Sequence, residues 1–346
     1  MKSIHIGVGG AGAGWIEQVS ASTDWEVAAL VDTRVTVLEA AGEQQGLPES
    51  QRFTSAEKAF REVEADAAFI TCPSPYHKDY FLMACEAGLH VAVEKVMAIT
   101  LEDGVKMLKA LNNSGNAGLV CQNYRYLPPF VGMRSAVAEG RIGKLDNCLV
   151  VWRHGAHQIG SYRARLQDGM LIDGAIHHLD LMRYMLNANA VAVQAYGRQP
   201  AYSWSEPNSV VGALVEFEDD VFVEFHANWT SHNNESNWEG NWRIEGDGGA
   251  LRWDWGWNEI VYSWHERDKG QNAHGAVKAK RLPLPRCPDS QKRLLDDFTE
   301  AIRSGGQPPT SPRDNIYSMA LAFAILRACR SRERVLVADL LSEAGL

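Results

Sequence analysis

The chain has 346 residues, of which 45% are hydrophobic, and its formal net charge at pH 7 is -9. This length predicts about two domains, and the apolar content excludes a disordered protein. The acidic balance and the absence of any Lys/Arg run argue against nucleic acid as a partner.

The start of the chain runs directly into an apolar strand, and no apolar stretch of about 18 residues occurs anywhere. The six cysteines are scattered without a C-x-x-C pair, which is typical of free thiols in a reducing compartment. We therefore expect a cytoplasmic protein with no membrane partner.

The first motif is a glycine-rich turn between a strand and a helix. The strand Ile4 to Val8 runs into Gly7-Val8-Gly9-Gly10-Ala11-Gly12, which fits G-x-G-x-x-G. The next strand ends in Asp32, 20 residues after Gly12, the spacing expected for an acid that binds a dinucleotide ribose. Such a turn holds a pyrophosphate against a helix N-terminus, where free N–H groups favour anions. The alternative is a turn without a ligand. The expected cofactor contacts here are Gly7, Gly9, Gly10, Ala11, Gly12 and Asp32.

Strands and helices go on alternating up to residue 122, which predicts a parallel, doubly wound sheet. Ligands bind such sheets beyond the carboxyl ends of the strands. We therefore expect the glycine turn, the loop Thr71 to Pro75, Lys95 and Asn123 to share one edge. The expected later strands are 26–31, 67–70, 90–93 and 118–122, and the expected helices are 13–22, 35–45, 55–63, 76–86 and 101–112.

The pattern becomes strand-rich after residue 122, with few intervening helices. This predicts a mainly antiparallel sheet that is open on one face. We place the domains at 1–122 and 123–346. The expected strands are 147–153, 191–196, 210–217, 221–229, 242–245, 251–255 and 259–264, and the later helices are 290–303 and 313–329.

Residues 168–186 read as one amphipathic helix. Its apolar stripe has the spacing of a face turned to a core. Asp173 and His177 lie beside it as i, i+4 neighbours, so the carboxylate can orient the imidazole. The alternative is a helix whose polar edge is merely solvated. The stripe comprises Ile172, Ala175, Ile176, Leu179, Met182 and Leu186.

These motifs together resemble the Gfo/Idh/MocA family, which includes glucose–fructose oxidoreductase, inositol dehydrogenase and rhizopine-catabolism oxidoreductases. The likeness covers nearly the whole chain, including the loop before His77, Asn123-Tyr124-Arg125, Asp173-x-x-x-His177 and the close at Ser331 to Val337. Where the family usually has Glu-Lys-Pro, this chain has Glu94-Lys95-Val96. The resemblance implies an α/β protein: an N-terminal Rossmann domain and a C-terminal α+β domain with a large, mainly antiparallel, open-faced sheet.

The resemblance also implies an NAD(P)-dependent dehydrogenase acting on a hydroxyl of a sugar, cyclitol, related polyol or sugar acid. By motif match, Lys95, Asp173 and His177 are catalytic. The Lys95 ammonium favours the developing alkoxide, His177 takes the proton of the hydroxyl, and Asp173 orients the imidazole of His177. Further expected cofactor contacts are Arg34, Cys72, Pro73, Ser74, His77, Glu94, Lys95 and Asn123. Expected substrate contacts are Lys95, Tyr124, Arg153, His154, His157, Arg163, Asp173 and His177.

Asp32 should repel a 2′-phosphate and favour NAD, while Arg34 could pair with that phosphate and give some NADP tolerance. A metal site could be formed by His154, His157, Asp173 and His177. Proton transfer already explains these residues, so we expect no metal. Two other functions stay open: a redox-neutral, NAD-dependent glycosidase, and a cofactor-sensing regulator without turnover.

Trp253, Trp255 and Trp257 alternate, so in a strand they would share one face. That face could stack on sugars, but we favour a subunit interface. The expected partner is a second copy, in a homodimer or homotetramer that pairs through the C-terminal sheet.

Overall fold

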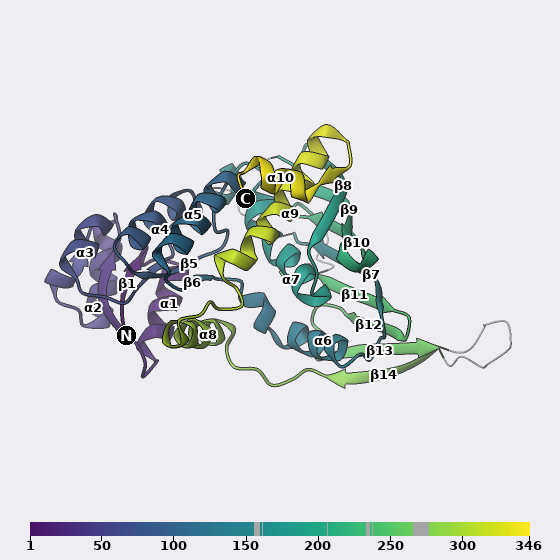
Figure 1. Ribbon diagram of the computed structural model, residues 1–346, viewed down its shortest axis with the longest axis horizontal. Helices are drawn as coiled ribbons and strands as arrows, with labels where there is room; N and C mark the ends of the chain where they lie inside the picture. The colour runs from purple at the N-terminus through teal and green to yellow at the C-terminus, as the bar shows by residue number, and fades with distance from the viewer. Residues whose placement is uncertain (156–159, 161, 206, 233–235, 237, 266–276) are drawn as a thin grey trace. The chain divides into compact units, whose positions relative to one another are not determined.

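The computed structural model describes residues 1–155, 160, 162–205, 207–232, 236, 238–265 and 277–346. Its internal contacts divide the chain into two compact units (Figure 1). Unit 1 comprises Met1–Asn123, Pro288–Ile316 and Ala344–Leu346, and unit 2 comprises Tyr124–Cys287 and Tyr317–Glu343. The expected second domain, 123–346, therefore needs a correction, because residues 288–316 group with the N-terminal sheet.

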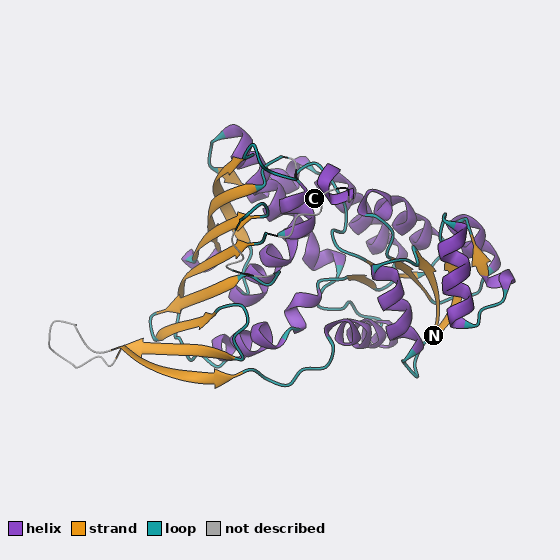
Figure 2. Ribbon diagram, turned by 180° about the vertical axis from the view of Figure 1, so that it is seen from behind, coloured by secondary structure: helices purple, strands orange, loops and turns teal. Residues whose placement is uncertain are grey.

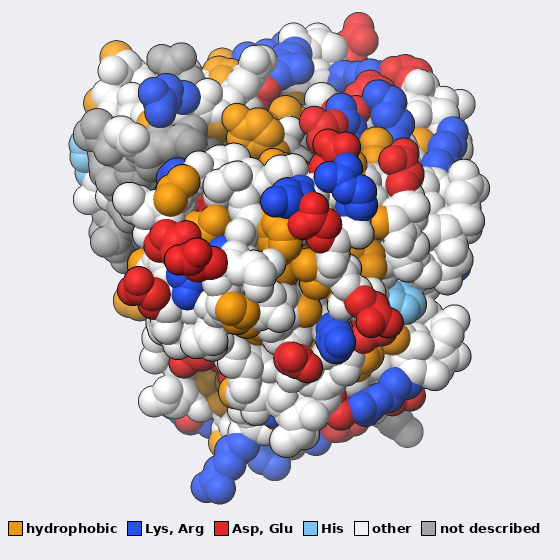
Figure 3. All heavy atoms as spheres, turned by 90° about the vertical axis from the view of Figure 1, so that its left-hand side faces the viewer, with side chains coloured by type: hydrophobic (Ala, Val, Ile, Leu, Met, Phe, Trp, Pro, Cys, Tyr) orange, Lys and Arg blue, Asp and Glu red, His pale blue; other side chains and the backbone are white. Residues whose placement is uncertain are grey.

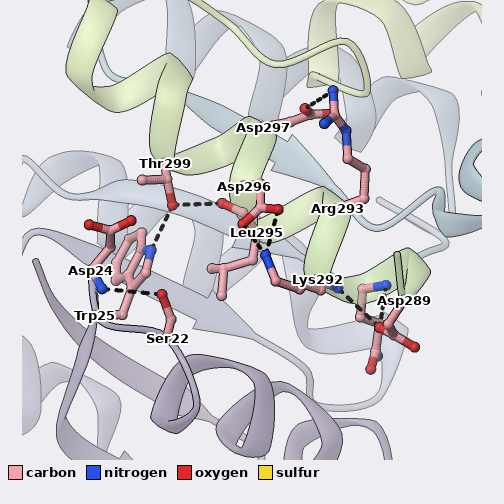
Figure 4. A network of polar contacts seen from close by, with 11 residues as sticks. Ser22, Asp24, Trp25, Asp289, Lys292, Arg293, Leu295, Asp296, Asp297 and Thr299 are labelled. Carbon is pink, nitrogen blue, oxygen red and sulfur yellow. Dashed lines mark hydrogen bonds and ion pairs between the residues drawn. The ribbon is translucent and has the colours of Figure 1, made fainter. Parts of the chain in front are cut away.

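Helix α8, Ser290–Ser304, explains this grouping. Trp25 Nε1 donates a hydrogen bond of 2.7 Å to Thr299 Oγ1 (Figure 4). Phe298 stacks on Trp25 with ring centroids 6.0 Å apart, and Val120 N donates to Thr310 O further along. A sequence pattern shows which face of a helix is apolar but not which sheet it covers.

The sheet of unit 1 is parallel throughout and has the strand order β3-β2-β1-β4-β5-β6, so the expected doubly wound fold is confirmed. The order reverses between β1 and β4, the position where such sheets bind ligands. The strands are β1 Lys2–Ile6, β2 Glu26–Val31, β3 Arg52–Phe53, β4 Ala67–Ile70, β5 His90–Val93 and β6 Gly118–Val120. The helices are α1 Ala11–Ser20, α2 Val35–Gln45, α3 Ala56–Glu62, α4 His77–Glu86 and α5 Leu101–Ser114.

The sheet of unit 2 has the order β14-β13-β12-β11-β7-β10-β9-β8-β15. Only β7 and β10 pair in parallel among these described strands, so the expected mainly antiparallel sheet is confirmed. The strands are β7 Leu145–Arg153, β8 Ala190–Arg198, β9 Val210–Phe217, β10 Phe222–Asn228, β11 Asn241–Gly246, β12 Gly249–Trp253, β13 Glu259–His265, β14 Val277–Pro283 and β15 Val335–Leu336.

In the described part of unit 2, helices lie against one face of this sheet and the other face is bare (Figure 2). The helices on the covered face include α6, Pro128–Ala138, and α7, Ile176–Leu186, which Figure 1 labels. The burial pattern of β9 alternates accordingly: Val215 and Phe217 are buried, whereas Leu214 is 46% exposed. The remaining helices are α9 Pro312–Ser331, which continues from unit 1 into unit 2, and α10 Val337–Glu343. In the part of the chain that is described, no helix has the length and apolarity needed to cross a membrane.

The expectation that three alternating tryptophans share a strand face is wrong. Strand β12 ends at Trp253, which is buried against Phe130 of α6, with ring centroids 5.7 Å apart. Trp255 and Trp257 lie in the turn that follows, where Trp257 N donates to Asp254 O and Gly256 has a φ of 82°. The turn breaks the two-residue period, so Trp255 is 45% exposed while Trp253 is only 4% exposed.

The surface drawn in Figure 3 mixes acidic and basic side chains, with hydrophobic groups scattered between them. Interspersed charge of both signs is the ordinary pattern of a solvated protein surface.

Candidate functional site

The glycine turn follows β1 and leads into α1. Gly12 has no room for a side chain, because a Cβ there would lie 1.9 Å from Gly7 O, and a Cβ on Gly7 would lie 2.6 Å from Cys72 N. Gly10 is the N-cap of α1 with a φ of 53°, and among the described residues no heavy atom beyond those of Gly10 and its two chain neighbours lies within 4 Å of its would-be Cβ. The space beside the helix N-terminus is therefore open to a phosphate group, and the residues present fit a dinucleotide.

Asp32 lies at the end of β2, where its buried carboxylate accepts hydrogen bonds from Val8 N at 3.1 Å and Arg34 N at 2.9 Å. The Arg34 side chain also pairs with it, Nε to Oδ1, at 3.1 Å. Burial pushes the pKa of Asp32 up, but the hydrogen bonds from Arg34 and Val8 outweigh it and lower the pKa overall. The two residues that we assigned separate roles at the ribose thus form one ion pair.

His77, at the start of α4, joins the loops that follow β4 and β5. Its Nε2 lies 2.8 Å from Cys72 O and its Nδ1 lies 2.8 Å from Val96 O. Within unit 1 the glycine turn, the Cys72 loop and the Lys95–Val96 loop are thereby brought to one sheet edge, where the sequence predicted them. The lysine and valine are joined by a cis peptide bond.

Each carboxylate oxygen of Glu94 accepts a hydrogen bond. Trp15 Nε1 donates to Oε1 at 2.9 Å, and Lys95 N donates to Oε2 at 3.1 Å. Asn123 lies in the 3-10 turn Asn123–Tyr126, and its Nδ2 donates to Ser290 Oγ of α8 at 3.2 Å. The contact of Asn123 with α8 could not be expected from the sequence, because the two are separated by 167 residues.

In unit 2 the expected single helix over 168–186 is wrong. Met170–Gly174 forms a π-helical turn, closed by a 2.7 Å bond from Ala175 N to Met170 O, and α7 begins only at Ile176. Gly174 permits this turn to pack on Trp152, since a Cβ there would lie 2.6 Å from the indole ring. π-Helical turns are rare and occur frequently at functional sites.

The stripe Ile172 to Leu186 is buried as expected, but the polar line beside it is buried too. Asp173 is 1% exposed and His177 is 8% exposed, so the alternative of a solvated polar edge is wrong. Asp173 Oδ2 accepts a 2.5 Å hydrogen bond from Arg163 Nε. Two of the expected substrate contacts, Arg163 and Asp173, thus bond directly to each other. Helical spacing did not suggest Arg163 as a partner of Asp173.

His177 lies flat against Tyr124, with ring centroids 4.1 Å apart and an interplanar angle of 4°. Burial, together with the charge of Glu239, raises the pKa of Tyr124. Glu239 Oε2 is itself buried without a hydrogen-bond partner among the described residues, and burial raises the pKa of this carboxyl group. The sequence analysis missed Glu239, which lies among tryptophans with no motif around it.

Arg125, next to Tyr124, forms a buried ion pair with Asp180 of α7. Arg125 Nε and Nη2 donate to the two carboxylate oxygens at 2.7 and 2.6 Å. Asp180 also accepts from Ser318 Oγ at 2.9 Å. The pair ties the segment that carries Tyr124 to the helix that carries His177.

The polar stretch after β7 is only partly described. His154 is 6% exposed, its ring lies 4.3 Å from that of Trp238, and burial lowers its pKa. Arg153 N donates to Ser236 Oγ at 2.8 Å, and His157 lies outside the described residues. Among the described residues, no group of His, Cys, Asp and Glu side chains has the geometry of a metal site.

Comparison with known proteins agrees with this architecture. Residues 1–122 match the oxidoreductase family with an NAD-binding Rossmann fold, and residues 130–252 match the GFO/IDH/MocA C-terminal domain. The chain is 26% identical to a 1,5-anhydro-D-fructose reductase from Ensifer adhaerens over 91% of this chain and 92% of that protein. It is 25% identical to an inositol 2-dehydrogenase from Corynebacterium glutamicum over 66% and 67% of the two chains.

Among solved structures, an oxidoreductase from Agrobacterium radiobacter in complex with NAD+, L-tartaric acid and magnesium has the same fold, with a TM-score of 0.83 and 21% identity over 99% of both chains. The glycine turn, Asp32 and the parallel sheet fit the same cofactor here. The chain belongs to the Gfo/Idh/MocA family of oxidoreductases, and NAD is its cofactor.

Proposed function

We propose that the protein is an NAD-dependent dehydrogenase that acts on a hydroxyl group of a sugar, a cyclitol or a related polyol or sugar acid. Similarity to a 1,5-anhydro-D-fructose reductase and to an inositol 2-dehydrogenase supports this substrate class. The observation that carries the proposal is the burial in unit 2 of two ionisable side chains: Asp173, whose carboxylate Arg163 holds, and His177, which stacks on Tyr124.

His177 acts as the base that takes the proton of the substrate hydroxyl. Tyr124 stacks on its imidazole and restricts the ring plane, and Asp173, held by Arg163, lies four positions earlier to orient the imidazole. Lys95 favours the developing alkoxide through its positive charge. NAD, when bound, supplies the hydride acceptor.

Glu239 suits a hydroxyl-rich substrate. Its unpartnered oxygen is an acceptor for a substrate O–H, and buried polar atoms without protein partners commonly mark ligand or water positions. Aromatic rings extend the same region, because Tyr124 contacts His178 and Trp152 contacts both His178 and Trp238. His154 packs on the last of these rings, which supports its place among the substrate contacts.

The test is a panel of sugars, cyclitols and sugar acids assayed for reduction of NAD+ and NADP+. We expect NADH formation with at least one compound, lowered about 10²–10⁴-fold in His177→Ala and retained in His265→Ala, an exposed histidine of β13. Cleavage of glycosides without net NADH, by a protein that retains NAD through purification, would instead support the redox-neutral glycosidase.

We also propose that the open face of the unit 2 sheet pairs with a second copy. Its exposed apolar side chains include Tyr196 at 58%, Leu214 at 46% and Phe222 at 37% exposure, and the first two line a hollow of about 550 Å³. Apolar groups gathered on one face support a contact surface. The turn around Trp255 is not part of the strands that form it.

A further inference from the structure

The residue that opens the π-helical turn has an uncommon backbone conformation. Asp168 has a φ of 55°, in the left-handed region that residues other than glycine seldom adopt. Its carbonyl oxygen accepts from Leu171 N at 3.0 Å and Ile172 N at 3.1 Å, so this conformation sets the direction in which the turn begins.

The side chain of Asp168 is buried and has two partners from distant parts of unit 2. Oδ1 accepts a 2.9 Å hydrogen bond from Asn208 Nδ2, and Oδ2 accepts from Arg330 Nη2 near the end of α9. The Asp168 side chain is 5% exposed and that of Arg330 is 57% exposed. Gly197 makes room for the amide, since a Cβ there would lie 2.6 Å from Asn208 Oδ1.

The other end of the turn is also held. Asp173 accepts from Arg163 at 2.5 Å, and Gly174 packs directly against the Trp152 ring. The turn from 168 to 174 is therefore held at both ends, with Asp173 inside it. A displacement of about 1 Å at a catalytic group can lower a rate by about 10²-fold, so the position of this carboxylate matters.

We propose that Asp168 is a positioning residue: its carboxylate, held by Arg330 and Asn208, fixes the left-handed start of the π-helical turn and thereby the place of Asp173 beside His177. The inference rests on the proposed function, which pairs Asp173 with His177. Asp168 acts through the turn and not on the substrate, because both of its carboxylate oxygens are bonded within the protein.

The experiment follows the titration of His177 by NMR in the full chain saturated with NAD+, with histidine labelled and the resonance assigned from His177→Gln. Asp173→Asn calibrates the readout, because loss of a neighbouring carboxylate lowers a histidine pKa. Arg330→Met removes the exposed partner of the Asp168 carboxylate, and Arg330→Lys restores the positive charge. The matched control is Arg327→Met, on the same helix α9 as Arg330, which breaks the exposed pair of Arg327 with Glu343 of α10.

We expect Arg330→Met to lower the His177 pKa by at least half the shift produced by Asp173→Asn, and Arg330→Lys to recover most of it. Arg327→Met should leave the titration at the wild-type position. If Asp173→Asn shifts the titration and Arg330→Met does not, the positioning role is refuted. If Asp173→Asn itself has no effect, the pairing in the proposed function has failed, and the inference fails with it.

Asp168→Gly provides a second variant that keeps the left-handed backbone but removes both side-chain bonds. Its His177 titration should shift as in Arg330→Met. Amide exchange of the backbone N–H groups of Leu171 and Ile172 should rise at least tenfold in both variants. Unchanged exchange in both variants would show that the turn does not depend on the bonds of the Asp168 carboxylate, and would overturn the proposal.

Discussion

Removal of the Asp180 carboxylate should destabilise unit 2 strongly. Asp180→Ala leaves the Arg125 guanidinium, which is 7% exposed, without the carboxylate that accepts two of its N–H groups at 2.6 and 2.7 Å. Breaking one partner out of a buried ion pair typically costs about 3–5 kcal/mol, because the other charge stays buried and uncompensated. For a unit of this size, that loss corresponds to a fall in melting temperature of about 6–20 °C.

The assay is thermal unfolding followed by near-UV circular dichroism, which senses the tryptophans of unit 2. The matched control is Glu216→Ala, which removes an equally bidentate carboxylate from Arg334, but in a pair whose side chains are 51% and 43% exposed. Solvent screening makes such exposed pairs weak, so the control should melt close to the wild type. Equal melting temperatures for the two variants would refute the reasoning that burial decides the effect.

Further predictions concern chemistry, cofactor choice, assembly and pH. His177→Ala should lower turnover by about 10²–10⁴-fold while NAD+ affinity, measured by fluorescence titration, stays at the wild-type value; near-full turnover would make Lys95 the leading base. Asp32→Ser should raise the NADP/NAD ratio of kcat/KM, since the carboxylate that repels a 2′-phosphate is gone and Arg34 is released from its pair; an unchanged ratio would contradict this. Leu214→Glu, which puts a charge on the open face of the unit 2 sheet, should lower the molar mass of the particles measured by light scattering. A wild-type protein that is already monomeric would contradict the proposed interface. Burial lowers the pKa of His178 from 6.5 to about 3, so the unfolded chain binds more protons between these values and stability should fall as pH drops through that window. His178→Phe should flatten this decline in chemical denaturation, and an equally steep decline would place its cause elsewhere.

Several features follow from local sequence alone. A strand, a glycine turn and a helix must be close in the chain to bind a phosphate, so G-x-G-x-x-G and the spacing to Asp32 predict the cofactor site from neighbouring residues. Alternation of strands and helices, followed by a strand-rich half, predicts one parallel and one mainly antiparallel sheet for the same reason. The apolar period predicts that the stripe from Ile172 to Leu186 is buried, which is confirmed, but it does not predict that the polar residues beside the stripe, such as Asp173 and Asp180, are buried as well.

Other features depend on contacts between residues far apart in the chain. The apolar stripe of α8 does not reveal that it packs on Trp25, because an amphipathic helix can cover any apolar surface. Strand β12 ends at Trp253 because the chain turns there, which overrides an alternating pattern that local residues still suggest.

The site shows the same division most clearly. The spacing of Asp173 and His177 predicts that the two side chains meet on one helix, and this stays a prediction, because an i, i+4 argument needs only residues that are close in the chain. The tertiary structure alone shows that the segment begins as a π-helical turn, in which Gly174 lies against the Trp152 ring and Asp168 accepts from Arg330, 162 residues away. No local pattern encodes these partners, because their energies arise from packing that exists only once the chain has folded.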